Sequence, residues 1–245
     1  MKNKNFIVVI PARYASKRLP GKPLKKIKGL SMIIRTCFQC AKAVGQKRIL
    51  VATDNKKIVN ECNKYGFKAE ITSKHCLTGT DRVFEIAKKT NYSYYINVQG
   101  DEPIFNPKDL SNLIKAKGKF KNEVLLGFTK IDNNFDIKNK SIPKVVISKQ
   151  GYLLYASRSK IPSNFHNRNI KYFRQVLAYG FPREKLIKFG NIKKKTNLET
   201  IEDIEILRFL ELGIKVKMIS MSNKSVSVDL NRDLKKVVKI LSKNS

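Results

Sequence analysis

A basic, turn-rich segment directly follows the first apolar run of the chain. Residues 10–24 read Ile-Pro-Ala-Arg-Tyr-Ala-Ser-Lys-Arg-Leu-Pro-Gly-Lys-Pro-Leu. Its four cations are Arg13, Lys17, Arg18 and Lys22. Arginine forks, a lysine point charge and free backbone N–H groups can together hold a chain of phosphates. The segment differs from a Walker A loop, because Ser16 and Pro23 replace its first Gly and its final hydroxyl. It therefore predicts a triphosphate site of another kind, and the alternative is a solvated basic loop.

Two acidic residues are candidates for binding a metal beside those phosphates. Asp101 lies in Asn-Val-Gln-Gly-Asp-Glu-Pro, residues 97–103, after a predicted strand, where Gly100 permits close approach of the backbone to a ligand. Mg²⁺ prefers one or two carboxylates together with phosphate oxygens, so Asp101 is a candidate ligand. Asp229 is the second, because the alternating residues 225–228 predict a strand that ends at it. The alternatives are a solvated turn at Asp101 and a helix cap at Asp229.

Two other groups of polar residues have spacings that suit a site. Residues 78–82, Thr-Gly-Thr-Asp-Arg, form a predicted turn that opens a helix, and its free amides can bind an anion or a base edge. The alternative is a simple capped helix start. Glu199, Glu202 and Glu205 recur at helical spacing, which predicts that they share one helix face.

Composition narrows the classes of function. A chain of 245 residues can bury one sizeable core, and we expect a single domain. The formal net charge of +32 comes mostly from Lys scattered over predicted surfaces, so it predicts weak attraction of anions and no specific nucleic-acid partner. A nucleic-acid-binding protein on a transferase fold stays as the alternative. No apolar run reaches the length of a membrane span or signal-peptide core, so we expect a cytoplasmic protein without membrane insertion.

The cysteines offer one further metal hypothesis. Cys37 and Cys40 have the Cys-x-x-Cys spacing of zinc sites, but the chain has no second such pair. Both lie in a helical apolar pattern, where small thiols pack well. We therefore expect reduced, structural cysteines.

These candidate residues must be positioned by an alternation of strands and helices. Strands are predicted at residues 6–10, 48–52, 68–71, 94–98 and 124–129. Helices are predicted between them at residues 32–44, 56–65, 80–89 and 108–117. Such alternation is typical of an α/β fold whose mostly parallel central sheet is covered by helices on both faces. Because right-handed crossovers bring the carboxyl ends of the strands to one edge, the candidate loops should converge on one crevice.

The second half of the chain has a less regular pattern. Residues 144–148 and 152–156 predict a hairpin, and residues 130–180 are expected to leave the sheet. Residues 180–182 are expected to begin a helix-rich stretch. A long helix at 198–212, a strand at 215–220 and a closing helix at 231–241 complete the prediction.

Five segments together resemble the 3-deoxy-manno-octulosonate (Kdo) cytidylyltransferases, the CMP-Kdo synthetase family. They are residues 11–24, 52–54, 78–82, 97–103 and 155–162. The resemblance runs from about Phe6 to Val238. It implies one Rossmann-like nucleotidyltransferase domain over residues 1–245, with residues 130–180 as an inserted dimerisation excursion. It also implies a homodimer that uses CTP, Mg²⁺ and a 3-deoxy-ulosonic acid for lipopolysaccharide or capsule synthesis; activation of a nine-carbon sialic-type acid is the alternative.

The resemblance implies a nucleotide half and a sugar half of one site. The residues expected to hold the triphosphate are Arg13, Arg18 and Lys22. Those expected to flank the cytosine are Thr78, Gly79 and Thr80. The expected metal ligands are Asp101 and Asp229. An anomeric hydroxyl would attack the α-phosphorus in line, and the expected catalytic residues are Arg13, Lys22 and Asp101.

The sugar half departs from the family pattern at two positions. The residues implied to bind the sugar acid are Gln99, Arg158, Gln175, Tyr179, Glu205 and Ile206. Gln175 stands where the family usually has His, and Ile206 where it usually has Gln. Because Gln carries no positive charge and Ile offers no hydrogen bond, we expect a changed preference among sugar acids.

Overall fold

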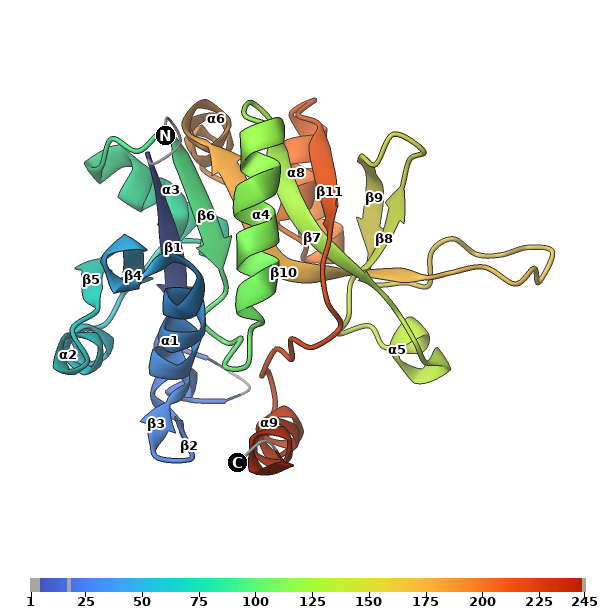
Figure 1. Ribbon diagram of the computed structural model, residues 1–245. Coiled ribbons are helices and arrows are strands. Elements are labelled where there is room, and N and C mark those ends of the chain that lie inside the picture. Colours follow the sequence, from blue (N-terminus) through green and yellow to red (C-terminus); the bar gives the residue numbers. More distant parts are fainter. Residues whose placement is uncertain (1–4, 17–18, 244–245) are drawn as a thin grey trace.

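The computed structural model describes residues 5–16 and 19–243. Over these residues a nine-stranded sheet lies between two layers of helices (Figure 1). The strands of its main path are β1 (Phe6–Ala12), β4 (Ile49–Thr53), β5 (Lys68–Ile71), β6 (Tyr94–Val98), β7 (Val124–Lys130), β10 (Phe173–Pro182) and β11 (Val216–Ser220). Two further strands, β8 (Lys144–Ile147) and β9 (Leu153–Ser157), branch from β10. A separate small ribbon is formed by β2 (Lys26–Ile27) and β3 (Leu30–Ser31).

The sheet is mostly parallel, as the alternating sequence pattern predicts. Its order is β11-β7-β10-β6-β1-β4-β5, and β1 pairs in parallel with both β4 and β6. Every residue of β1 is buried, because helices cover both faces and leave no solvated side. The predicted α/β fold class is therefore confirmed.

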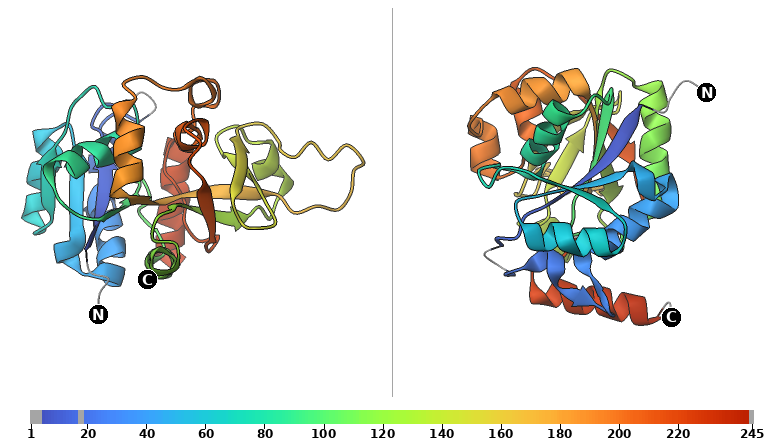
Figure 2. Two further views of the ribbon diagram at one scale, coloured as in Figure 1. Left: turned by 90° about the horizontal axis from the view of Figure 1, so that it is seen from above. Right: turned by 90° about the vertical axis from the view of Figure 1, so that its left-hand side faces the viewer.

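Two hydrophobic layers hold the helices against the sheet. One face is covered by α1 (Met32–Val44), α2 (Lys56–Lys64) and α4 (Pro107–Lys119), and the other by α3 (Gly79–Lys89), α6 (Arg183–Asn191) and α8 (Ile206–Glu211). The right-hand view of Figure 2 shows α1 and α4 on one side of the sheet and α3 and α6 on the other. The last helix, α9 (Asn231–Lys243), packs near β2 and β3 through Val237 and Ile27.

The α1–α2 layer contains the cysteine pair. Cys37, Cys40 and Cys62 are free thiols buried in one apolar cluster. Burial raises the pKa of the Cys62 thiol to about 12. These side chains therefore act as small core residues in this layer.

The central strand β10 is the largest departure from the predicted pattern. Residues 130–180 were expected to leave the sheet, with a helix-rich stretch after residue 180, yet β10 runs antiparallel between β6 and β7. The sequence Gly180-Phe181-Pro182 resembles a turn, but Gly180 packs against the Tyr94 ring, where an added Cβ would lie 2.7 Å from the hydroxyl oxygen. Pro182 is the last strand residue and leads into α6. The segment that leaves the sheet is therefore shorter than predicted.

That projecting segment, residues 131–172, extends from one end of the sheet (Figure 1). It contains α5 (Asn134–Lys138) and the antiparallel pair β8–β9, which confirms the predicted hairpin. Three large apolar side chains on it are strongly exposed: Phe135, Leu154 and Phe165. Among the described residues, no helix combines the length and apolar character needed to cross a membrane.

The predicted helix 198–212 is two short helices, so the prediction of one continuous helix is wrong. α7 (Asn197–Glu202) and α8 are separated by Asp203, whose φ of 50° lies in the left-handed region. The three expected helix-face glutamates consequently have different partners. Glu199 pairs with Arg208, Glu202 with Ser157, and Glu205 with the amide of Thr80.

A buried ion pair holds the two short helices together. The Arg208 guanidinium makes two bonds to Glu199, of 2.6 and 2.7 Å, and a third bond of 2.8 Å to Asp81 on α3. The side chains of Arg208 and Glu199 are fully buried. The guanidinium also lies over the Phe189 ring, 3.8 Å from its centroid. This network fixes α7 and α8 against α3, and thereby positions Asp203 and Glu205.

We expect Glu199→Gln to lower the free energy of unfolding by about 3–5 kcal/mol, because it leaves a buried guanidinium without its main counter-charge. Urea denaturation measures this. The matched control is Glu184→Gln, since Glu184 is largely exposed beside Lys185 and its change should cost under about 1 kcal/mol. A loss below about 1 kcal/mol for Glu199→Gln would mean that the pair does not stabilise the fold.

Candidate active site

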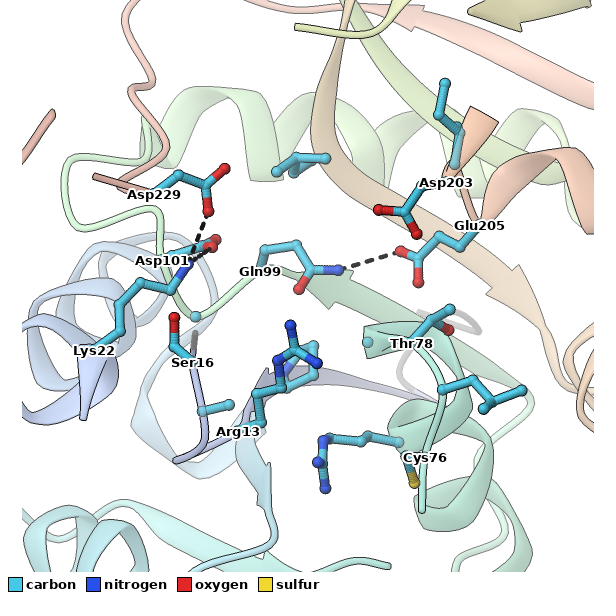
Figure 3. Close-up of a pocket in the computed structure, with 18 of the residues that line it drawn as sticks. Arg13, Ser16, Lys22, Cys76, Thr78, Gln99, Asp101, Asp203, Glu205 and Asp229 are labelled. Atoms are coloured by element: carbon cyan, nitrogen blue, oxygen red, sulfur yellow. Dashed lines mark hydrogen bonds and ion pairs between the residues drawn. The ribbon is translucent and has the colours of Figure 1, made fainter. Parts of the chain in front are cut away.

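A polar cavity of about 640 Å³ opens at the carboxyl ends of the parallel strands. Its walls come from the loops after β1, β5 and β6, together with β10, the α7–α8 junction and the segment before α9. The predicted convergence of loops on one crevice is thus confirmed. In the close-up of the cavity in Figure 3, Gln99 lies near the centre.

One end of the cavity brings a lysine between two carboxylates. Lys22 lies in the short 3₁₀ turn Lys22–Leu24, which follows Gly21 at a φ of 64°. Its Nζ is 2.6 Å from Asp101 Oδ2 and 3.1 Å from Asp229 Oδ1 (Figure 3). Burial alone lowers the pKa of Lys22, but the two carboxylates outweigh it and the pKa is raised. Residues far apart in the sequence therefore meet here, and Lys22 stays charged.

Asp101 is held in place by the tight packing of its neighbour. Gly100 donates its N–H to Pro11 O, and a Cβ at Gly100 would lie 2.8 Å from that oxygen. The glycine is therefore required for contact with β1, in addition to lining the cavity. Asp101 Oδ1 is buried and has no hydrogen-bond partner. An unpartnered carboxylate oxygen at the cavity wall leaves an open position for a ligand.

Asp229 reaches the cavity from a segment without regular secondary structure and not from the strand predicted over residues 225–228. The backbone N–H of Val228 donates to Asp101 O at 2.9 Å, which ties this segment to the loop after β6. Asp233 accepts the N–H groups of Asp229 and Leu230 at the start of α9. The Asp229 carboxylate faces Lys22 instead. The two carboxylates form an all-oxygen set that fits Mg²⁺, and the unpartnered Asp101 oxygen supports this fit.

The loop after β1, which is predicted to bind phosphate, is anchored by an ion pair between α3 and the end of β4. Arg82 on α3 binds Asp54 at 2.7 Å, and the other Asp54 oxygen accepts the N–H of Tyr14 at 3.0 Å. Arg13 lines the cavity from this loop and is exposed to solvent. Arg18, the third predicted phosphate ligand, lies outside the described residues.

The start of α3 forms another wall. Thr78 caps the helix in a reciprocal capping box with Asp81, so the alternative of a capped helix start describes its local structure. Thr78 and Gly79 also line the cavity. Thr80 does not, because its side chain is fully buried and its N–H donates to Glu205 Oε2 at 3.0 Å. Of the three residues predicted to flank a base, two therefore face the cavity.

The opposite end of the cavity carries a hydrogen-bonded set of uncharged and acidic groups. Gln99 Nε2 donates to Glu205 Oε1 at 3.2 Å (Figure 3). Gln175 Nε2 donates to the Tyr179 hydroxyl at 3.4 Å, and Gln175 Oε1 is buried without a partner. Burial raises the pKa of Glu205, although the Thr80 N–H favours its charged form. These groups can accept and donate hydrogen bonds to hydroxyls.

Arg158 closes this end of the cavity, and Ile206 does not reach it. Arg158 follows β9 and lines the cavity. Ile206 begins α8, where its side chain is 1% exposed and packs with Phe209 in the core. The prediction that Ile206 contacts a sugar is therefore corrected: the start of α8 turns this side chain toward the sheet.

Lys195 and Asp203 are among the cavity residues that were not predicted from the sequence. Lys195 lies between α6 and α7, and Asp203 lies at the break between α7 and α8. A hydrogen bond from Lys195 lowers the pKa of Asp203, and Arg158 and Arg13 lower it further. Lys195 belongs to a run of three lysines at residues 193–195, just before the helix expected over residues 198–212, and Asp203 falls inside that expected helix.

Cations, a pair of carboxylates and a polar end share one cavity at the strand ends of this sheet, which is the arrangement expected of an α/β nucleotidyltransferase. The family model described as cytidylyltransferase matches residues 7–219.

Similar proteins narrow this class. A 3-deoxy-manno-octulosonate cytidylyltransferase of Fusobacterium nucleatum is 38% identical over 98% of this chain and 98% of its own length. One of Koribacter versatilis is also 38% identical, over 96% of this chain and 89% of its own. The solved structure of CMP:2-keto-3-deoxy-manno-octonic acid synthetase complexed with CTP is similar with a TM-score of 0.91 and 30% identity, covering 99% of this chain and all of that one. The chain belongs to the 3-deoxy-manno-octulosonate cytidylyltransferase family.

Proposed function

We propose that the protein transfers CMP from CTP to the anomeric hydroxyl of Kdo, or of a closely related 3-deoxy-ulosonic acid, and releases pyrophosphate. The observation that carries the proposal is that the two ends of this cavity differ in charge. Lys22, Asp101 and Asp229 meet at one end, while Gln99 and Glu205 meet at the other. A triphosphate can therefore bind at the Lys22 end, while a polyhydroxylated acid binds at the Glu205 end. The relatives of the same family and the CTP-bound neighbour support this assignment.

In this proposal the phosphate end supplies charge to the reacting α-phosphate. Lys22 and Arg13 lie at the cavity wall and neutralise the charge that develops as pyrophosphate leaves. Arg18 is proposed as a further triphosphate contact. Asp101 and Asp229 would hold Mg²⁺, which when bound supplies Lewis-acid polarisation and a template for the phosphates. Because these groups are positioned before reaction, much of the rate derives from orientation.

The other walls orient the two substrates. Thr78 and Gly79 are proposed to flank the cytosine, since free amides at the start of α3 can meet a base edge. Glu205, Gln99 and Gln175 are proposed to bind sugar hydroxyls. Tyr179 reaches Gln175 through its hydroxyl and supports it. The attacking hydroxyl must lie between these groups and the α-phosphate.

The test is a substrate panel. The protein is incubated with each of the four nucleoside triphosphates, Mg²⁺ and eight- or nine-carbon ulosonic acids, and pyrophosphate is measured. We expect release with CTP and an eight-carbon acid. Release only with a nine-carbon sialic-type acid would favour that alternative, and release with none from folded protein would contradict the proposal.

We further propose that the protein acts as a homodimer through the projecting segment, residues 131–172. The exposed apolar side chains of Phe135, Leu154 and Phe165 support this, because such surface on a projecting element usually contacts another chain. The enzyme would act in the cytoplasm and supply lipopolysaccharide or capsule assembly.

We expect Leu154→Glu to shift the protein from dimer toward monomer in light scattering coupled to gel filtration, because the change places a charge in the proposed apolar contact. Leu154 is 58% exposed on β9, so the fold should tolerate the change. The matched control is Ile201→Glu, at a residue 69% exposed on α7. An unchanged mass for Leu154→Glu, or a monomeric parent protein, would contradict the proposed interface.

A further inference from the structure

A cluster of three charged residues borders the cavity at its Glu205 end: Arg158, Lys195 and Asp203. Asp203 lies between the two cations, with Oδ1 2.5 Å from Lys195 Nζ and Oδ2 3.6 Å from an Arg158 nitrogen. Figure 3 shows Asp203 beside Glu205, across the cavity from Lys22 and Asp101. The cluster is therefore separate from the phosphate end.

The guanidinium of Arg158 is held by the backbone. Its Nε donates to Glu202 O at 2.7 Å, one terminal nitrogen donates to Lys140 O at 3.1 Å, and the other to Asp203 O at 2.9 Å. Three of its five N–H donors are thus used for orientation, and two remain. A fixed guanidinium with unused donors at a cavity wall is suited to a carboxylate.

Lys195 is a second cation at the same wall. Of three consecutive lysines, Lys195 is the one that lines the cavity, and its side chain is 27% exposed. Lys194 is exposed to solvent. Asp203 holds Lys195 toward the cavity, and its left-handed backbone at the α7–α8 break is what brings its carboxylate there. The three members of the cluster carry a net charge of about +1, and Arg13 adds positive charge near Asp203, while Glu202 and Glu205 are the neighbouring carboxylates.

We propose that Lys195 is a binding residue for the carboxylate of the sugar acid, and that Asp203 positions it. This inference rests on the proposed function. It names two residues that act on the sugar acid together with Arg158. The triphosphate is bound at the other end of the cavity, so Lys195 selects for the acid and leaves CTP binding unaffected.

The first test compares steady-state kinetics of variants. Lys195→Met is expected to raise the KM for Kdo about tenfold, because it removes one charge-assisted hydrogen bond, while the KM for CTP and kcat change less than about twofold. Lys195→Arg keeps the positive charge and should leave the KM for Kdo close to the parent value. Lys194→Met is the matched control and should leave all three constants unchanged. Melting temperatures of the variants exclude loss of fold as the cause.

A second test changes the ligand. The carboxamide of Kdo lacks the negative charge, and its inhibition constant is compared with that of a non-reacting Kdo analogue that keeps the carboxylate. We expect the parent protein to prefer the acid, and Lys195→Met to reduce that preference about tenfold. The same comparison is made in an Asp203→Asn background, because Asn tolerates the left-handed backbone. There, Lys195→Met should change the preference for the acid over the carboxamide by less than about threefold.

These outcomes separate the inference from the proposed function. If the parent protein uses CTP and Kdo while Lys195→Met keeps its KM for Kdo and its preference for the acid, the role of Lys195 is wrong and the function stands. If Lys195→Met still lowers the preference for the acid tenfold in the Asp203→Asn background, Asp203 does not position Lys195. If the parent protein uses no ulosonic acid, the proposed function fails and this inference fails with it.

Discussion

Asp101→Asn is expected to lower turnover about a hundredfold or more, with the fold intact, because it replaces a charged oxygen ligand by a neutral amide of the same shape. The change also weakens the 2.6 Å contact with Lys22. Steady-state pyrophosphate release measures turnover, and circular dichroism with thermal melting reports the fold. Asp229→Asn should lower turnover by a similar factor, because the Asp229 carboxylate faces the same lysine.

The control for both variants is Asp132→Asn. Asp132 is more than half exposed and lies away from the cavity, on the surface after β7. Its change should leave turnover within about twofold of the parent value. Near-normal turnover in Asp229→Asn alone would show that this residue serves the start of α9 and not the metal.

Lys22→Met is the second change with a large expected effect. We expect kcat to fall about 10²–10³-fold, because one preorganised cation at the developing charge is lost. Met keeps much of the length of the side chain. In the absence of nucleotide, however, the same variant should bind Mn²⁺ more tightly, since the ammonium that now lies between Asp101 and Asp229 is removed.

Electron paramagnetic resonance of free Mn²⁺ measures that affinity without any turnover. Lys25→Met is the matched control, because Lys25 is exposed on the same turn. Unfolding would lower both kcat and Mn²⁺ affinity, so a lower kcat together with tighter Mn²⁺ binding excludes it as the cause. A loss of both would show that Lys22 organises the carboxylates and does not compete with a cation for them.

Much of the fold follows from local sequence pattern. The α1 and β6 bounds match the predicted ranges, because each is a buried element with the expected period and clear breakers at its ends. β10 could not be predicted in this way. Its membership of the sheet depends on β6 and β7 on either side, and its Gly and Pro residues have the composition of a turn.

The phosphate end of the site was easier to predict than the sugar end. Lys22 and Asp101 come from the loops that follow the neighbouring parallel strands β1 and β6, so the topology brings the two loops to the same edge of the sheet. Asp203 and Ile206 depend instead on one left-handed residue that divides a helical pattern. The break places the Asp203 carboxylate in the cavity and turns Ile206 into the core, and no periodicity in the sequence indicates it.

The central claim is that CMP is joined to the sugar acid in this cavity, and ³¹P NMR of a reaction with CTP, Kdo and Mg²⁺ tests it most directly. We predict one new phosphodiester signal in equal amount to pyrophosphate, absent when Kdo is omitted and strongly reduced with Asp101→Asn. Pyrophosphate with free CMP and no phosphodiester, or an undiminished product signal from Asp101→Asn, would contradict the account.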